Sequence, residues 1–227
     1  MPIYRLSSHL EFPPPDAAED GLLAVGGDLQ PERLLLAYQE GIFPWYDEDN
    51  PILWWSPDPR FVLYPDAFHL PKRTRRHIRS AGYTISMDTA FPDVIQACAE
   101  IPRHGENGTW ITPEMEAAYT TLFDMGYAHS IECRQDGELV GGLYGVSIGA
   151  CFSGESMFSW RNNASKAALA ALIDFARRHQ FHFIDCQMHT EHLEHLGARD
   201  INRSQFLAEL AIALRHETVH GPWKSEL

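Results

Sequence analysis

The sequence lacks any long uninterrupted apolar run. Its N-terminal stretch, where a secretion signal would lie, is broken by Arg5 and Glu11. A membrane-spanning helix needs about 20 consecutive apolar residues, and a signal peptide needs an apolar core of its own. We therefore expect neither a transmembrane helix nor a signal peptide, and we predict a cytosolic (cytoplasmic) protein with no membrane partner.

Cysteine is scarce as well. No CxxC pair occurs, which argues against a zinc ribbon or a thiol redox motif. Because nothing suggests secretion, we interpret the cysteines as reduced thiols of a buried core. They are Cys98, Cys133, Cys151 and Cys186.

Basic residues are few compared with acidic ones. The chain has 18 lysines and arginines against 31 aspartates and glutamates, a net charge of −13, which argues against general affinity for nucleic acids. The distribution is uneven, however, because residues 60–79 hold six basic side chains and one acid, Asp66. This patch predicts salt-dependent nucleic-acid binding in one orientation. A solvated helix face is the alternative.

The composition is that of a globular protein with a sizeable core, since 44% of the 227 residues are hydrophobic and 22% are charged. The first sixty residues are rich in proline, glycine and aromatic residues, which favour turns and short elements. One helix is predicted at Pro31–Glu40, with proline in its first turn and Gly41 just beyond its end. We predict a small N-terminal α/β domain at residues 1–60 and a larger domain at 61–227.

The larger domain alternates between strand and helix patterns. Asp136-Gly137 between two alternating segments predicts a hairpin turn, and Asn163 predicts a helix cap. The order of elements predicts an α/β (α+β) fold with a mostly antiparallel sheet, compatible with an N-acetyltransferase-like domain. The predicted strands are Arg60–Tyr64, Gly82–Met87, His129–Arg134, Glu138–Ile148, Ala150–Phe158 and Phe181–Met188. The predicted helices are Pro71–Arg79, Phe91–Glu100, Pro113–Met125, Ala164–His179 and Arg203–His216.

Two short motifs suggest chemistry that their context does not support. The segment 154–158 (GESMF) resembles a nucleophile elbow, but its second glycine is missing and it joins strand to strand. His189, His192 and His195 recur every third residue, without an HExxH motif or a cysteine partner. A hydrogen-bonding or solvated histidine face is therefore favoured over a metal site.

The strongest candidate for chemistry lies on the predicted strand Phe181–Met188. Side chains alternate along a strand, so Asp185 and Gln187 should share one face. Glu155, on the preceding strand, is an acid among apolar neighbours. Two carboxylates and an amide near the centre of a sheet predict a proton-handling site. A buried polar pair that fixes the strand register is the alternative.

Aromatic residues are dense in the first half of the chain. Most such rings belong to a core, which is one reading here. Exposed rings near the FPW segment, Tyr38 and Trp45, are the other reading, because they could stack on a nucleic-acid base. The dense set consists of Trp45, Tyr46, Trp54, Trp55 and Trp110.

Several blocks together resemble the bacterial leucyl/phenylalanyl-tRNA–protein transferases. The match runs in order from about residue 3 to 215. The resemblance implies an enzyme that moves Leu or Phe, and less well Met, from aminoacyl-tRNA to the N-terminal amine of proteins beginning with Arg or Lys. The modified proteins would enter N-end-rule degradation. The blocks are GLLAVGGDL (21–29), LLAYQEGIFPW (35–45), PILWWSPDPR (51–60), GTWIT (108–112), GESMFS (154–159), NASK (163–166) and IDCQ (184–187).

The resemblance also implies roles for individual residues. The implied catalytic residues are Asp185, Gln187 and Glu155. We expect Asp185 to accept or relay the proton of the acceptor amine, through Gln187 or a water, and Glu155 to orient the donor's own amine or the incoming amine. The implied amino-acid pocket consists of Trp110, Tyr119, Leu143, Phe152, Leu169, Leu172 and Ile184. The implied adenosine contacts are Tyr38 and Trp45, and the implied tRNA contacts are Lys72, Arg73, Arg75 and Arg76.

An activated ester donor needs no cofactor or metal, so none is expected, and we expect a monomer. Two alternatives stay open, an acyl-coenzyme A–dependent N-acyltransferase and a noncatalytic tRNA-end binding protein. The first is disfavoured because residues 160–166 (WRNNASK) lack the glycines that bind the pyrophosphate of coenzyme A at a helix N-terminus.

Overall fold

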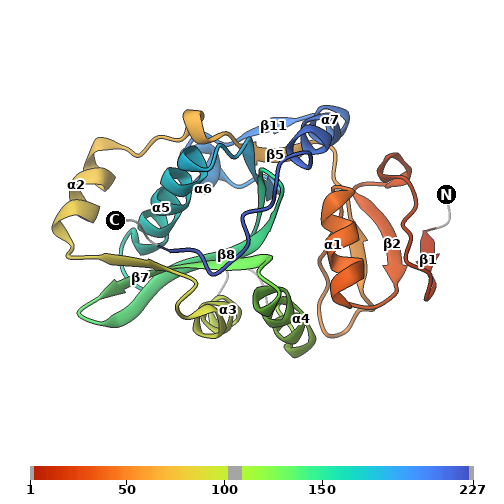
Figure 1. Ribbon diagram of the computed structural model, residues 1–227, viewed down its shortest axis with the longest axis horizontal. Helices are drawn as coiled ribbons and strands as arrows, with labels where there is room; N and C mark the ends of the chain where they lie inside the picture. Colours follow the sequence, from red (N-terminus) through yellow and green to blue (C-terminus); the bar gives the residue numbers. More distant parts are fainter. Residues whose placement is uncertain (1–2, 102–108, 225–227) are drawn as a thin grey trace.

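The computed structural model describes residues 3–101 and 109–224 and is elongated, with two β-sheets along its long axis (Figure 1). Residues 3–58, here called the N-terminal module, form the smaller sheet at one end of the molecule. The larger sheet begins at Arg60. Gly108, the first residue of the GTWIT block, lies outside the described residues.

The N-terminal module combines a four-stranded sheet with one helix. Its strands lie in the order β1-β2-β4-β3, with β1 parallel to β2 and the other pairs antiparallel. Helix α1 (Pro31–Gln39) begins with proline, whose fixed φ suits the first helical position. The strands are β1 (Tyr4–Leu6), β2 (Leu22–Gly26), β3 (Phe43–Pro44) and β4 (Leu53–Trp55).

The larger sheet has seven strands in the order β11-β5-β10-β9-β8-β7-β6. Among the described strands, β9 and β10 run parallel, and every other neighbouring pair is antiparallel. The predicted hairpin turn is confirmed, with φ of 53° at Asp136 and 85° at Gly137. The strands are β5 (Arg60–Leu63), β6 (Thr84–Met87), β7 (Ala128–Gln135), β8 (Glu138–Ile148), β9 (Cys151–Ser159), β10 (Phe183–Gln187) and β11 (Arg199–Ile201).

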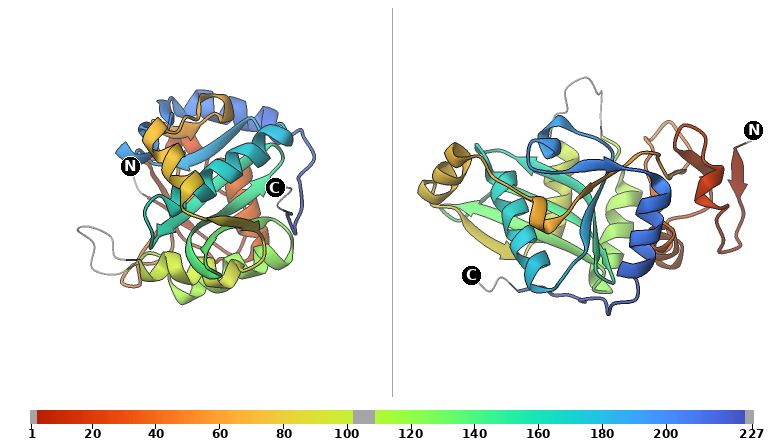
Figure 2. Two further views of the ribbon diagram at one scale, coloured as in Figure 1. Left: turned by 90° about the vertical axis from the view of Figure 1, so that its left-hand side faces the viewer. Right: turned by 90° about the horizontal axis from the view of Figure 1, so that it is seen from above.

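Helices cover both faces of this sheet (Figure 2). Alternation along β8 separates two cores, because Leu143 packs in the core beneath α5 and Tyr144 in the core beneath α3 and α4. The helices are α2 (Lys72–Ser80), α3 (Phe91–Glu100), α4 (Pro113–Asp124), α5 (Ala164–Arg178), α6 (Glu191–Glu194) and α7 (Arg203–Ala213).

The N-terminal module shares a hydrophobic core with the rest of the chain. Leu23 and Trp54 of the module belong to the same buried cluster as Phe91 and Tyr119 of α3 and α4. Helix α1 also contacts α4. The module therefore buries its aromatic side chains against the larger sheet and its helices.

Several boundaries differ from the sequence prediction. Strand β10 begins at Phe183, because the chain turns through a left-handed Gln180 and enters the sheet later than its apolar pattern suggests. Asn163 does precede α5, but with φ of 64° and no capping hydrogen bond from its side chain. The short elements α6 and β11 were not predicted, since four and three residues carry too little periodicity. None of the described helices is long and apolar enough to cross a membrane.

Candidate active site

The site lies where β9 and β10 separate. The two strands pair only from Cys151–Ser153 to Phe183–Asp185. Beyond that point β9 continues beside β8 to Ser159, while β10 ends at Gln187. Residues past the last shared pair therefore border an opening inside the sheet.

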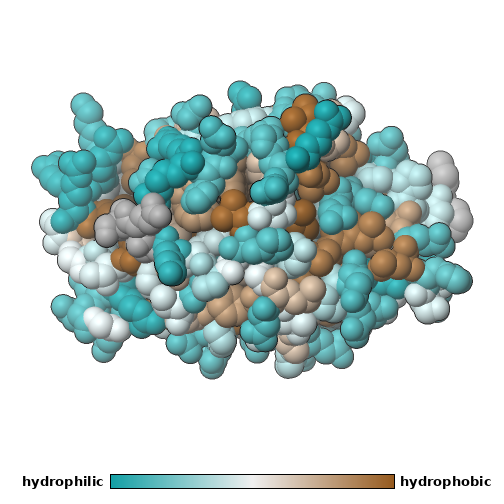
Figure 3. All heavy atoms as spheres, in the orientation of Figure 1, coloured by the Kyte–Doolittle hydropathy of each residue, from teal (hydrophilic) through white to brown (hydrophobic). Residues whose placement is uncertain are grey.

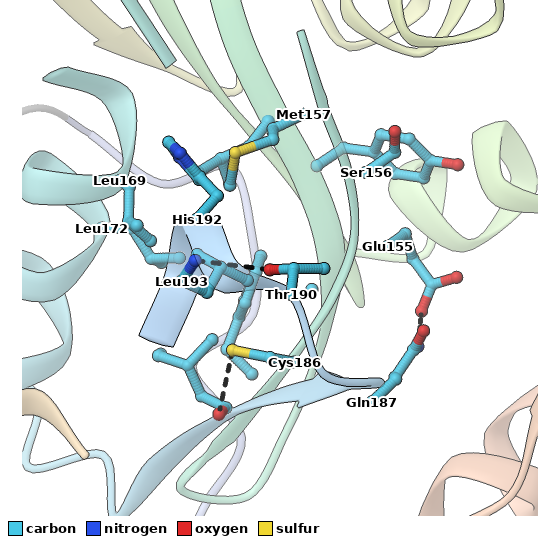
Figure 4. A pocket seen from close by; sticks show the side chains of 15 residues that line it. Glu155, Ser156, Met157, Leu169, Leu172, Cys186, Gln187, Thr190, His192 and Leu193 are labelled. Carbon is cyan, nitrogen blue, oxygen red and sulfur yellow. Dashed lines mark hydrogen bonds between the residues drawn. The ribbon is translucent and has the colours of Figure 1, made fainter. Parts of the chain in front are cut away.

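A cavity of about 280 Å³ occupies this opening (Figure 4). Most of its wall is apolar and comes from the three central strands and α5. Polar side chains gather at one side, where Glu155 and Gln187 point toward each other. The lining residues are Leu143, Tyr144, Phe152, Gly154, Glu155, Ser156, Met157, Leu169, Leu172, Ile184, Cys186, Gln187, Thr190, His192 and Leu193.

Glu155 is the centre of a hydrogen-bonded cluster at the polar side of the cavity. Its Oε2 accepts from the hydroxyl of Tyr119 at 2.9 Å, and its Oε1 accepts from Nε2 of Gln187 at 2.8 Å. The hydroxyl of Tyr119 lies 2.5 Å from that of Tyr38. Side chains from α1, α4, β9 and β10 thus meet at one carboxyl group.

Burial sets the protonation of this cluster. It raises the pKa of Glu155 to about 7, against the opposing effect of hydrogen bonds from Tyr119, Tyr38 and Gln187. Burial and the charge of Glu155 hold the pKa of both phenols well above its usual value. Near neutral pH the cluster therefore combines two neutral hydroxyl groups with a carboxyl group close to half ionisation.

Asp185 is in a different environment, a buried ion pair with Arg60. Nε of Arg60 donates to Oδ1 at 2.8 Å, and Nη2 donates to Oδ2 at 2.6 Å. Oδ1 also accepts from the backbone N–H of Gln187 at 2.9 Å. Asp185 is 2% exposed. Among the described residues that line the cavity, Gln187 is present and Asp185 is not.

The expectation that Asp185 and Gln187 share one strand face is wrong. The pairing register shifts between them, and Gln187 has φ of 64°. This left-handed backbone breaks the alternation of a regular strand. The side chain of Gln187 consequently turns toward Glu155, while that of Asp185 turns toward Arg60.

The predicted amino-acid pocket is largely brought together. Of its seven members, five line the cavity: Leu143, Phe152, Leu169, Leu172 and Ile184. Tyr119 contributes through its hydroxyl contact to Glu155. Trp110 lies outside the cavity lining, partly buried against the core that the N-terminal module shares with α3 and α4.

Sequence reasoning missed several groups at or near the site. Met157, Cys186 and His192 line the cavity, and Arg60 anchors Asp185 from the first residue of β5. A signal for Arg60 did exist, because an arginine opens an otherwise apolar strand, RFVL. A charge in that position needs a buried partner.

Neither of the two rings proposed to stack on a base is fully exposed. Tyr38 is 5% exposed, and its ring packs in the core with its hydroxyl on Tyr119. Its reading as an exposed ring is therefore wrong. Trp45 is half-buried and meets Trp55 edge-to-face, with ring centroids 5.6 Å apart.

Apart from Arg60, which is buried in an ion pair with Asp185, the basic patch is carried by α2, at the opposite end of the molecule from the N-terminal module (Figure 1). Hydrophilic side chains cover this end (Figure 3). Lys72, Arg73, Arg75 and Arg76 are all exposed. A shallow groove there is lined by Lys72, Arg75, Arg76, Arg79 and Ser80.

The histidine repeat does not build a metal site. Helix α6 spans only Glu191–Glu194, so His189 precedes it, and that ring lies 3.7 Å from Glu194 and 3.6 Å from Asp200. Within residues 3–101 and 109–224, no three histidine, cysteine or acidic side chains are arranged to hold a metal ion.

Fold and site together define a mixed α/β enzyme. Its larger sheet opens into an apolar pocket, and at one side of this pocket lies a carboxyl group with a pKa of about 7. Models of one family match most of the chain. The model for leucyl/phenylalanyl-tRNA protein transferase covers residues 62–211, and that for the N-terminal domain of this transferase covers residues 27–58. The chain belongs to the leucyl/phenylalanyl-tRNA–protein transferase family.

Individual relatives agree with this assignment. The chain is 56% identical over 228 residues to the leucyl/phenylalanyl-tRNA–protein transferase of Desulfatibacillum aliphaticivorans, with 100% of this chain and 97% of the relative covered. It is 54% identical over 225 residues to that of Anaeromyxobacter sp. (strain K), with 99% and 97% covered.

Two solved N-acetyltransferases resemble parts of the structure. A ribosomal-protein-alanine N-acetyltransferase from Brucella melitensis biovar Abortus 2308 gives a TM-score of 0.34 at 17% identity, over 44% of this chain and 74% of its own. A GCN5-related N-acetyltransferase from Kribbella flavida gives 0.33 at 12% identity, over 73% and 59%. The predicted fold class, mixed α/β with a small N-terminal sheet and a mostly antiparallel larger sheet, is confirmed by the topology.

Proposed function

We propose that this enzyme transfers Leu or Phe, and less well Met, from the 3′ end of aminoacyl-tRNA to the N-terminal α-amine of proteins that begin with Arg or Lys. Family membership supplies the reaction class. The single observation that supports the site is the apolar cavity whose polar side is formed by Glu155 and Gln187. The apolar wall suits the side chain of Leu, Phe or Met, and it disfavours a charged donor.

The reaction is aminolysis of an ester. The acceptor amine attacks the carbonyl carbon of the donor, a C–N bond forms, and the C–O bond to the terminal ribose breaks. One proton leaves the amine and one reaches the ribose oxygen. An α-amine has a pKa of about 8, so a proton acceptor whose own pKa is near neutrality is well matched to it. Glu155, with a pKa of about 7, is the group proposed to take this proton and return it to the leaving oxygen.

Gln187 is proposed to orient the incoming amine. Its Nε2 is committed to Glu155, so its carbonyl oxygen is the end that would accept a hydrogen bond from the amine. Tyr119 and Tyr38 hold Glu155 from the opposite side. Placing two substrates and a proton acceptor together supplies much of the rate of such a reaction.

Asp185 is proposed to position Gln187 rather than to accept the proton. Both of its oxygens receive hydrogen bonds from Arg60, and one also receives the backbone N–H of Gln187. Asp185 is also absent from the described residues that line the cavity, so it is not placed to meet the incoming amine. Its contribution would be to fix the bend at the end of β10.

The α2 patch is proposed to bind tRNA phosphates, with Lys72, Arg73, Arg75 and Arg76 as contacts. Their exposure and their separation from the acidic remainder of the chain support this role. Trp45 is proposed to contact the terminal adenosine. Tyr38, whose ring is buried and whose hydroxyl lies on Tyr119, is proposed to contribute by holding the cluster around Glu155 rather than by stacking on the base.

A transfer assay tests the proposal. Leu-tRNA carrying a radiolabelled Leu is mixed with a peptide that begins with Arg and with a matched peptide that begins with Glu. Label is expected on the Arg peptide and not on the Glu peptide. Acetyl-coenzyme A replaces the tRNA in a parallel reaction, and acetylation of either peptide would favour an acyl-coenzyme A enzyme instead.

A further inference from the structure

Arg60 joins three parts of the molecule from a fully buried position. Among the described arginines, Arg60 and Arg33 are the buried ones, each 1% exposed. Arg60 is the first residue of β5, directly after the N-terminal module. Burying a guanidinium costs free energy unless its donors find acceptors, so the contacts of Arg60 indicate its role.

The guanidinium donates in two directions. Nε and Nη2 form the paired contacts to Asp185, at 2.8 and 2.6 Å. Nη1 donates to the backbone carbonyl of Gly41, in the N-terminal module, at 3.1 Å. The planar group is further held between the rings of Phe43 and Phe206, 4.8 and 4.4 Å from their centroids. One side chain thus connects the N-terminal module, β10 and α7.

The contact to Asp185 leads on to the cavity. Asp185 accepts the backbone N–H of Gln187 at 2.9 Å, and Gln187 holds its left-handed φ of 64° at that point. A non-glycine residue keeps such a backbone only when its surroundings hold it there. The side chain of Gln187 then reaches Glu155 at 2.8 Å.

We propose that Arg60 is a positioning residue for the transfer reaction, which acts through Asp185 to fix the bend at Gln187 and which makes that bend depend on the docked N-terminal module. This inference rests on the proposed function, because it assumes that Gln187 orients the incoming amine. Arg60 itself is not among the described residues that line the cavity.

An arginine is required for this role. Three donors of one planar group reach two carboxylate oxygens and a carbonyl at fixed angles. Lysine has a single ammonium group and cannot reproduce the paired contact to Asp185 and the Gly41 contact together. Arg60→Lys therefore keeps the charge and loses the geometry.

The experiment combines Arg60→Lys with Gln187→Ala in a double-mutant cycle on the full chain. Arg60→Lys alone is expected to lower kcat by about 100-fold, the effect of a misplaced reactive group, with little change in KM for Leu-tRNA. In the Gln187→Ala background the same change is expected to lower kcat by less than about threefold. Equal effects of Arg60→Lys in both backgrounds would overturn the proposal, and so would an effect on KM alone.

The matched control is Arg33→Lys. Arg33 is equally buried and pairs with Asp28 within the N-terminal module, at 3.3 Å. Both lysine variants are expected to lower Tm, but only Arg60→Lys should lower kcat. If Arg60→Lys does not fold, Asp185→Asn replaces it in the same cycle, since it weakens the pair without changing its shape. If Gln187→Ala leaves kcat unchanged, the proposed role of Gln187 is wrong and the Arg60 proposal falls with it. If Gln187→Ala lowers kcat and the effects add, only the Arg60 proposal is wrong.

Discussion

At the scale of single residues, Glu155 and Asp185 show how surroundings separate two chemically similar groups. Glu155 is held by neutral donors, and burial raises its pKa to about 7. Asp185 faces a guanidinium that donates to both of its oxygens. The first is suited to exchange a proton near neutral pH, and the second is placed to hold Arg60 and the backbone of Gln187.

The first prediction concerns the pH dependence of catalysis through Glu155. Below its pKa the carboxyl group is protonated and cannot accept a proton, so its contribution to kcat should rise as the pH increases through about 7. Glu155→Gln should lower kcat by about 100-fold or more at high pH and by much less at low pH. The ratio of wild-type to variant kcat, measured between about pH 6 and about pH 8, isolates this effect, because ionisation of the acceptor amine is common to both. A ratio that does not change with pH contradicts the assignment.

The raised pKa of Glu155 also predicts that the difference in stability between wild type and Glu155→Gln depends on pH. The pKa of Glu155 is raised on folding, so its burial costs nothing below the unfolded pKa, and the cost grows as the pH rises through about 7. Glu155→Gln should therefore gain stability relative to wild type with rising pH, by about 3 kcal/mol in all, because the pKa rises from 4.5 to about 7 on folding and each unit is worth about 1.4 kcal/mol. Urea unfolding at about pH 5 and about pH 8 measures the difference. A relative stability that is constant with pH would mean that the group is already ionised in the folded protein throughout.

Leu172 offers a prediction about donor choice. It is buried in α5 and lines the cavity, so Leu172→Ala enlarges the pocket. We expect kcat/KM for Phe-tRNA relative to Leu-tRNA to increase by about tenfold or more, because even one methylene in an apolar pocket is worth about tenfold and this substitution removes three carbon atoms. Leu122→Ala is the control, because Leu122 is equally buried in the other core and does not line the cavity. Both variants should be destabilised by about 2–5 kcal/mol, and only the first should change the preference.

At the scale of elements, the sequence patterns predict most strands of the larger sheet and most helices that cover it, because apolar periodicity is strong in this part of the chain. They do not predict how β9 and β10 diverge, since β8 directly precedes β9 in sequence whereas β10 follows it only after α5. They also miss the bend at Gln187, where a left-handed backbone in a non-glycine residue has no sequence signal. The site residues could be named from the sequence, whereas the separate roles of Asp185 and Gln187 required the register shift between them.

The exposed basic side chains of α2 lead to a prediction about the salt dependence of tRNA binding. Replacing Arg75 and Arg76 by glutamate should weaken the binding of Leu-tRNA and lower the slope of log affinity against log salt by about 2. The control is the same change at Arg178, the last residue of α5, and Arg215, which follows α7; both are exposed. Filter binding across a salt series measures both slopes. Equal slopes for the two double variants contradict the assignment of α2 as the phosphate contact.

At the scale of the whole molecule, the N-terminal module and the cavity beside Glu155 are parts of one folded unit. The module shares a buried core with α3 and α4, and its helix α1 supplies Tyr38 to the cluster around Glu155. Arg60 adds a polar connection from Gly41 to Asp185. A site assembled from both sheets in this way should lose its geometry if the module detaches, even when the larger sheet stays folded.

Cooperative unfolding is the corresponding prediction. Trp54 is fully buried in the smaller sheet, where its Nε1 donates to Gly26 at 2.8 Å and its ring meets Phe12 edge-to-face. Trp54→Ala should lower the free energy of unfolding by about 3–5 kcal/mol. Hydrogen exchange in low denaturant should show the same loss of protection for the backbone amides of β4 and of β8, because the shared core makes both sheets open together. Ile212→Ala, at an exposed position of α7, should change neither. Protection lost in β4 and retained in β8 would mean that the module opens by itself, and transfer activity would then fall before the larger sheet unfolds.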